Sequence, residues 1–87
     1  MWTVKIKKKQ LKNLEKIPVE VQKLFKVLLL DLRDKGPIRH EWKNYSKLGK
    51  DKYHCHLNYN YVACWTADNE KITIEVYYVG SREKAPY

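Results

Sequence analysis

The chain begins with an alternation of apolar and polar side chains, which is typical of a strand with one buried face. The apolar positions of this strand are Trp2, Val4 and Ile6. A short helix is predicted over residues 9–16, because the next apolar residues recur at a wider spacing. These residues are Leu11, Leu14 and Ile17.

A longer helix is predicted to restart at Pro18, because proline is well tolerated in a first helical turn. Apolar residues then recur at i, i+3, i+4, i+7 and i+11, the stripe of an amphipathic helix. The stripe consists of Val21, Leu24, Phe25, Leu28 and Leu32. Gly36 and Pro37 favour an end after Lys35. We expect Leu24, Phe25, Leu28 and Leu32 to form the core together with Trp65, Ile74 and Val76.

The second half of the chain predicts three strands, over residues 52–58, 61–67 and 71–79. Turn-forming residues at 58–60 and 68–70 separate them at hairpin length. Residues 37–51 have no periodicity, and we expect an irregular segment anchored by Trp42, Tyr45 or Leu48. The order β-α-α-β-β-β predicts an α+β fold, with a two-helix layer on a small, largely antiparallel sheet of about four strands. Residues 1–87 are expected to form a single domain.

A three-residue loop at 58–60 fixes a register that pairs His54 with Cys64 and Cys55 with Ala63. His54 and His56 then lie on the sheet face away from the helices, and Cys55 faces the helices. The two thiols would lie on opposite faces, which prevents a disulfide. Two free thiols and no disulfide framework favour a cytoplasmic protein. We expect no membrane span, because the longest apolar run is Val27–Leu30, and no signal peptide, because the alternating strand pattern follows Met1 directly.

The charge of the chain is uneven. Its formal net charge is +8, but residues 1–50 hold 14 Lys and Arg against 5 Asp and Glu, whereas residues 51–87 are slightly acidic. A basic half on so small a protein suggests a polyanionic partner, with nucleic acid the leading candidate. A lysine-rich solubilising surface is the alternative.

The histidine pair in "KYHCHLNYNYVACW" has three interpretations: a metal chelate, an acid/base pair, or an exposed strand face without a role. His-x-His is half of a metal site, and no Cys-x-x-Cys accompanies it, so we expect no metal and no cofactor. The acid/base interpretation requires other groups that bind phosphate. Arg82 follows the last strand, where a guanidinium can bind a phosphate through paired hydrogen bonds. Tyr87 adds a phenol or a stacking ring.

The whole chain resembles the RelE/ParE superfamily of bacterial toxins from type II toxin–antitoxin systems, and its RelE-like branch in particular. The resemblance rests on the β-α-α-β-β-β order, on "KLGKDKYHCHL" at the second predicted strand, and on "IEVYYVGSREKAPY" at the end of the chain. The latter is similar to the family's last strand, Val-Gly-x-Arg motif and terminal tyrosine. No one of these motifs is specific, but their order and spacing together are.

The resemblance implies a metal-independent, ribosome-dependent endoribonuclease that cuts mRNA by activating a ribose 2′-hydroxyl. His54, His56, Arg82 and Tyr87 are the catalytic residues that it implies. The histidines stand where relatives often carry lysines, and Val62 stands where some carry a further arginine. The partners would be a cognate antitoxin, which covers the basic face and the groove near Arg82, and the ribosome with its mRNA. We expect Lys7, Lys8, Lys9, Lys12, Lys47, Lys50 and Lys52 to contact RNA and the ribosome.

Two other functions remain open. A ParE-like toxin would keep the fold, inhibit DNA gyrase by protein binding and lack a convergent acid/base set. A non-catalytic basic module would bind RNA by stacking bases on aromatic residues such as Tyr59 and Tyr61.

Overall fold

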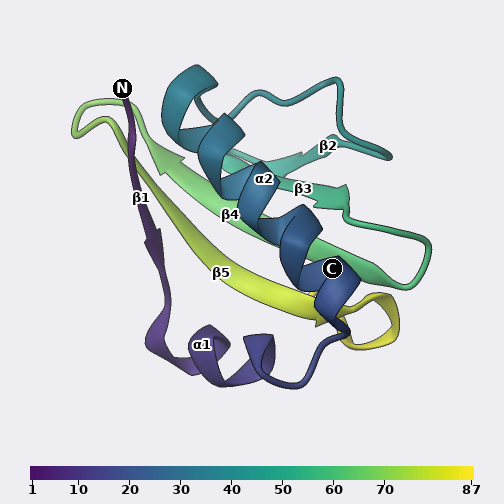
Figure 1. Ribbon diagram of the computed structural model, residues 1–87. Coiled ribbons are helices and arrows are strands. Elements are labelled where there is room, and N and C mark those ends of the chain that lie inside the picture. The colour runs from purple at the N-terminus through teal and green to yellow at the C-terminus, as the bar shows by residue number, and fades with distance from the viewer.

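The protein folds into one five-stranded sheet with α2 across one face and α1 beside an edge (Figure 1). The computed structural model describes all 87 residues. The helices are α1 (Lys8–Leu14) and α2 (Val19–Lys35). The strands are β1 (Thr3–Ile6), β2 (Ser46–Gly49), β3 (Lys52–His56), β4 (Tyr61–Asp68) and β5 (Thr73–Ser81), and a short 3-10 helix, η1 (Arg82–Lys84), follows. The predicted α+β class and element order are confirmed, but the sheet has five strands, in the order β1-β5-β4-β3-β2.

Helix α2 supplies one side of the hydrophobic core. Val21, Phe25, Leu28 and Leu32 are buried along its inner face, as the apolar stripe predicts. Leu24 is 37% exposed, so its assignment to the core was wrong. The four buried positions already form a narrow stripe, and Leu24 falls at its margin. The helix ends at Gly36, whose φ of +91° suits a residue without a side chain.

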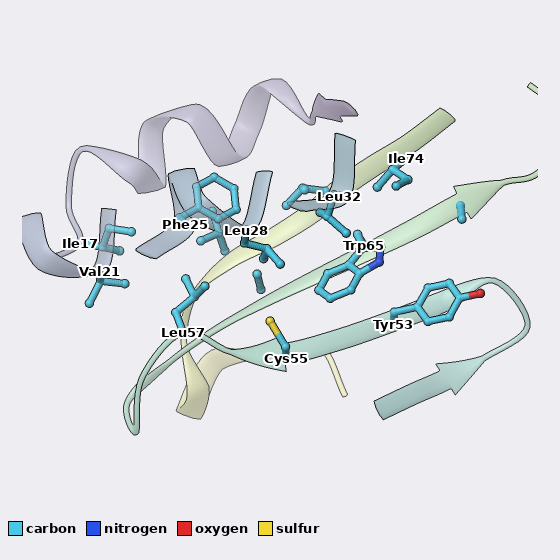
Figure 2. Packing of buried hydrophobic residues seen from close by; sticks show 14 residues of the cluster. Ile17, Val21, Phe25, Leu28, Leu32, Tyr53, Cys55, Leu57, Trp65 and Ile74 are labelled. Atoms are coloured by element: carbon cyan, nitrogen blue, oxygen red, sulfur yellow. The ribbon is translucent and has the colours of Figure 1, made fainter. Parts of the chain in front are cut away.

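The predicted register of the central hairpin is confirmed. His54 pairs with Cys64, and Cys55 pairs with Ala63, in the antiparallel ladder of β3 and β4. Cys55 therefore points into the core with Tyr53 and Trp65, beneath Phe25, Leu28 and Leu32 of α2 (Figure 2). The two cysteines are free and buried on opposite faces of the sheet. Because the core occupies the helix-facing side, the two histidines are left on the other face.

Strand β2 was not predicted. Residues 46–49 lie within the segment that we expected to be irregular, and they form the edge of the sheet by antiparallel pairing with β3. The predicted anchors of this segment are in part confirmed, because Trp42 and Tyr45 pack against the core. The indole Nε1 of Trp42 also donates a hydrogen bond to Asp31 Oδ2 of α2, at 2.8 Å.

Strand β5 contains a bulge that changes the facing of its second half. Val76 pairs with Trp65, and Tyr78 pairs with the next residue, Cys64, which leaves Tyr77 as the extra residue. Tyr78 therefore does not share a face with Ile74 and Val76, although the three residues alternate in the sequence. Val79 takes the core position instead.

The second half of β5 has no strand on its outer edge, and α1 lies beside it (Figure 1). Gln10 of α1 is buried, and its Oε1 accepts a hydrogen bond from the backbone N–H of Val79 at 3.0 Å. This bond satisfies a donor that β1 does not reach, because β1 ends opposite Val76. Neither helix is long and apolar enough to cross a membrane.

Candidate active site

His54 and His56 lie side by side on the sheet face away from α2. Their ring centroids are 5.7 Å apart. Nδ1 of His54 lies 2.9 Å from the hydroxyl of Ser46 on β2. Nδ1 of His56 lies 3.4 Å from the side-chain amide nitrogen, Nδ2, of Asn44, in the turn before β2. In each histidine Nδ1 therefore lies next to a side chain of residues 44–46, and Nε2 has no such contact.

The residues after β5 fold back onto the histidine face. The backbone N–H of Arg82 donates to the carbonyl of Asn60 at 2.8 Å, which ties η1 to the β3–β4 loop. Five residues later, the ring of Tyr87 lies 4.5 Å from the ring of His54, between centroids. His54 is only 7% exposed as a result of these contacts and its place in the sheet. The tail thus brings a phenol and a guanidinium to the same face as the two imidazoles.

Arg82 is exposed and makes none of the three ion pairs in the structure. Its guanidinium lies over the ring of Tyr59, with Cζ 4.6 Å from the ring centroid. Tyr59 stands at the tip of the β3–β4 loop and is 68% exposed. The stacking contact holds the charge of Arg82 beside the histidines and leaves its N–H groups available to an anion.

The surroundings of both histidines favour the neutral imidazole. Burial lowers the pKa of His54, and the positive charge that His56 can carry lowers it further, against a smaller opposing effect of a hydrogen bond to the Ser46 backbone. Burial also lowers the pKa of His56, as do the charges of Arg82 and Lys43. At neutral pH these rings can therefore accept a proton. Burial raises the pKa of Tyr87, so its hydroxyl keeps its proton.

No family model matches the chain, and no curated protein matches it in sequence. Solved structures do match. The archaeal RelE–RelB complex from Pyrococcus horikoshii has a TM-score of 0.77 at 20% identity, over 97% of this chain and 98% of that one. The chain has the RelE fold. The isolated RelE toxin of E. coli follows at a TM-score of 0.76 and 21% identity, over 99% of this chain and 89% of its own. The YoeB–YefM complex from Staphylococcus aureus matches at 0.71 and 13%, over 92% and 95%.

On this RelE fold, the seven lysines that we expected to contact RNA do not form one surface. Lys7 immediately precedes α1, and Lys8, Lys9 and Lys12 lie on that helix, beside β5. Lys47, Lys50 and Lys52 lie at the opposite edge, on β2, β3 and the turn between them. Lys47 lies over the ring of Tyr53 on the helix-facing side, with Nζ 6.0 Å from the centroid. Of the seven, Lys52 shares the side of β3 that carries both histidines.

Three further residues of the candidate site were not predicted from the sequence: Lys43, Asn44 and Ser46. All three belong to the segment that we expected to be irregular, where no periodicity marks a facing. Their place follows from pairing with β3, since the backbone N–H of His56 donates to the Lys43 carbonyl at 2.7 Å, and Ser46 pairs with His54. Residue type gave no signal for them, although the structure shows that Asn44 has a φ of +53°, a conformation in which asparagine is enriched.

The two thiols are unsuited to a chemical role. Burial raises the pKa of Cys55 and of Cys64 to about 12. Neither is therefore a thiolate at neutral pH, and the thiolate is the nucleophilic form of cysteine. The histidines and Tyr87 are therefore the candidate groups for proton transfer at this site.

Proposed function

We propose that the protein is the toxin of a type II toxin–antitoxin system and acts in the cytoplasm as an endoribonuclease that cuts mRNA on the ribosome. The observation that carries this proposal is the convergence of two imidazoles, a phenol and an unpaired guanidinium on one sheet face. The RelE fold, shared with proteins described as RelE and YoeB toxins, supports it.

The chemistry needs three groups around one phosphate. A neutral histidine accepts the proton of a ribose 2′-hydroxyl, whose oxygen then forms a bond to the adjacent phosphorus. Arg82 binds the phosphate oxygens, where negative charge accumulates. The bond from phosphorus to the 5′-oxygen breaks, and that oxygen takes a proton from the second histidine, in its protonated form, or from Tyr87. The products are a 2′,3′-cyclic phosphate and a 5′-hydroxyl, and no metal or cofactor takes part in these steps.

The cluster of two histidines, Tyr87 and Arg82 also discriminates between the candidate functions. A gyrase inhibitor or a non-catalytic RNA-binding module needs no pair of imidazoles with lowered pKa beside a free cation. Perturbed titratable groups gathered with a phosphate-binding group are instead typical of catalytic sites. The lowered pKa of both histidines therefore favours the nuclease.

The test is cleavage of mRNA on programmed ribosomes by the double variant His54→Ala/His56→Ala. Loss of general acid or base catalysis typically costs about 10²–10⁴ in rate, so we expect cleavage to fall by at least that much. The third histidine, His40, provides the control, because its ring packs on Tyr45 and not on the pair. His40→Ala should cleave at the parent rate. Cleavage by the double variant at the parent rate would disprove the proposal.

The antitoxin of this system would have a place to bind. A groove of about 510 Å³ lies between β1 and α2, lined by apolar residues and by Lys26 and Arg33. Its apolar lining comes from Trp2, Val4, Ile6, Leu29 and Leu30. We propose that a segment of the antitoxin with apolar and acidic side chains occupies it, because both chemistries are complementary to the groove. This site is additional to the expected contact near Arg82, which does not line the groove.

A further inference from the structure

The edge of the sheet next to the histidines consists of polar residues that contact both rings. Ser46 of β2 is exposed, and its hydroxyl lies 2.9 Å from Nδ1 of His54. Asn44, two residues earlier, reaches Nδ1 of His56 at 3.4 Å. Both contacts are to Nδ1. In each ring Nε2 is therefore the nitrogen that is left for a substrate.

His54 depends on this contact more than His56 does. It is 7% exposed, and the ring of Tyr87, which lies against it at an interplanar angle of 50°, makes no hydrogen bond to it in the structure. The other titratable groups beside it are His56 and Cys64, which pairs with His54 in the ladder of β3 and β4. The hydroxyl of Ser46 is thus the one side-chain partner of a buried ring nitrogen. A buried imidazole without it would be free to rotate or to move its proton between Nδ1 and Nε2.

We propose that Ser46 is a positioning residue for His54: its hydroxyl holds Nδ1, so that Nε2 is presented to the reacting RNA with a fixed orientation. The effect of Ser46 on catalysis rests on the proposed nuclease function. Its contact with His54 is present without RNA and can be measured in the free protein. Asn44 acts in the same way on His56, through a longer and weaker contact.

The variants separate positioning from folding. Ser46→Ala removes the hydroxyl at an exposed edge position and keeps the backbone pairing of β2 with β3. Ser46→Thr restores a hydroxyl and suits a strand. Asn44→Gly removes the amide and tolerates the left-handed backbone of this residue, whose φ is +53°. It serves as the matched control, because it should change the tautomer population of His56 and leave the tautomer population of His54 unaltered.

The first measurement is the ¹⁵N spectrum of the histidine rings in the free protein, recorded across a pH titration. In Ser46→Ala we expect the tautomer population of His54 to change and its pKa to fall further, because the imidazolium loses the hydroxyl as an acceptor for Nδ1–H and keeps only the Ser46 backbone. His56 should titrate as in the parent. Ser46→Thr should return His54 to its parent values. Unchanged ring shifts and an unchanged pKa of His54 in Ser46→Ala would overturn the proposal.

The second measurement is cleavage on programmed ribosomes. We expect kcat of Ser46→Ala to fall on the order of 10- to 100-fold with little change in KM, because a reacting group misplaced by a fraction of an ångström loses rate and not binding. Ser46→Thr should recover most of the rate. A parent rate in Ser46→Ala would overturn the catalytic part of the proposal. If the parent itself does not cleave, the proposed function fails, and the ring spectra alone decide whether Ser46 holds His54.

Discussion

A histidine titrates according to the charges around it, and His56 has two cations nearby. After burial, the charges of Arg82 and Lys43 are the causes that lower its pKa. Lys43 is the more useful of the two for a test, because its carbonyl, which accepts from the His56 backbone, survives any change of the side chain. Its charge acts on the equilibrium between imidazole and imidazolium, and so on the pH at which His56 can act as a base.

We therefore expect Lys43→Ala to raise the pKa of His56 toward its ordinary value of about 6.5. The acid limb of kcat/KM, which reports the free enzyme, should move to higher pH in the same direction. In the parent this limb should lie below pH ~6.5. Lys47→Ala is the control, since Lys47 lies over Tyr53 on the other face. Equal titration of His56 in the parent and in Lys43→Ala, followed by NMR, would contradict this account.

The same lowered values predict the direction in which pH changes stability. A folded-state pKa below the unfolded one means that the unfolded chain takes up protons first as the pH falls. The contribution of His54 and His56 to the free energy of unfolding is therefore fully present above pH ~6.5, and it is lost as the pH falls through their lower folded-state pKa values.

Tyr87 brings both a ring and a hydroxyl to the site, and the two can be separated. Its ring lies 4.5 Å from His54, and burial keeps its hydroxyl protonated. Tyr87→Phe keeps the ring. If the hydroxyl donates the proton to the leaving 5′-oxygen, we expect cleavage to fall by about 10²-fold or more, with ribosome binding unchanged. A parent rate in Tyr87→Phe, with loss in Tyr87→Ala, would instead assign Tyr87 a stacking role.

At the scale of elements, α2 offers a matched pair of leucines. Leu28 is fully buried, and Leu24 is 37% exposed on the same helix. We expect Leu28→Ala to lower the free energy of unfolding by about 2–5 kcal/mol, through lost burial and a cavity. Leu24→Ala should cost less than about 1 kcal/mol, because its side chain already contacts water. Urea unfolding of both variants measures the difference, and equal losses would refute the assignment of the inner face of α2.

The elements that could be predicted are those with a local, periodic signal. The stripe of α2 and the hairpin of β3 and β4 lie in the sequence itself, and they gave the correct register. Strand β2 has one apolar residue, Leu48, and is a strand because β3 pairs with it, which is a non-local cause. The alternation from Ile74 through Tyr78 gives no sign of the bulge at Tyr77, so the face on which Tyr78 lies could not be predicted from the sequence.

The residues of the candidate site likewise divide into those that could be predicted from the sequence and those that depend on non-local pairing. His54, His56, Arg82 and Tyr87 could be singled out by residue type and by resemblance. Ser46 and Asn44 could not, because serine and asparagine are ordinary loop residues, and their contacts with the rings depend on how β2 pairs. Groups that position a reacting residue are therefore harder to find in a sequence than the reacting residue itself.

At the scale of the whole molecule, the charge of +8 bears on association with the proposed antitoxin. Opposite charges accelerate encounter, and salt screens them over about 8–10 Å. We expect the association rate constant with a cognate acidic antitoxin to fall about tenfold or more between about 50 mM and 500 mM salt. Lys26→Glu, at the rim of the β1–α2 groove, should lower the rate at low salt and remove part of its salt dependence. Stopped-flow mixing measures both, and a rate independent of salt would contradict electrostatic steering.

The parallel pairing of β1 with β5 also determines when the nascent chain can complete its sheet. Thr3 pairs with Thr73, roughly 70 residues later, so the first strand has no neighbour until the last one has been synthesised. At about 5–20 residues per second, that delay lasts roughly 4–14 s. The arginine and tyrosine that complete the proposed site come later still, at positions 82 and 87. Neither the complete sheet nor the face that carries the proposed site can exist until β5 and the residues after it have been made, so the proposed nuclease activity can appear only after those residues have been synthesised.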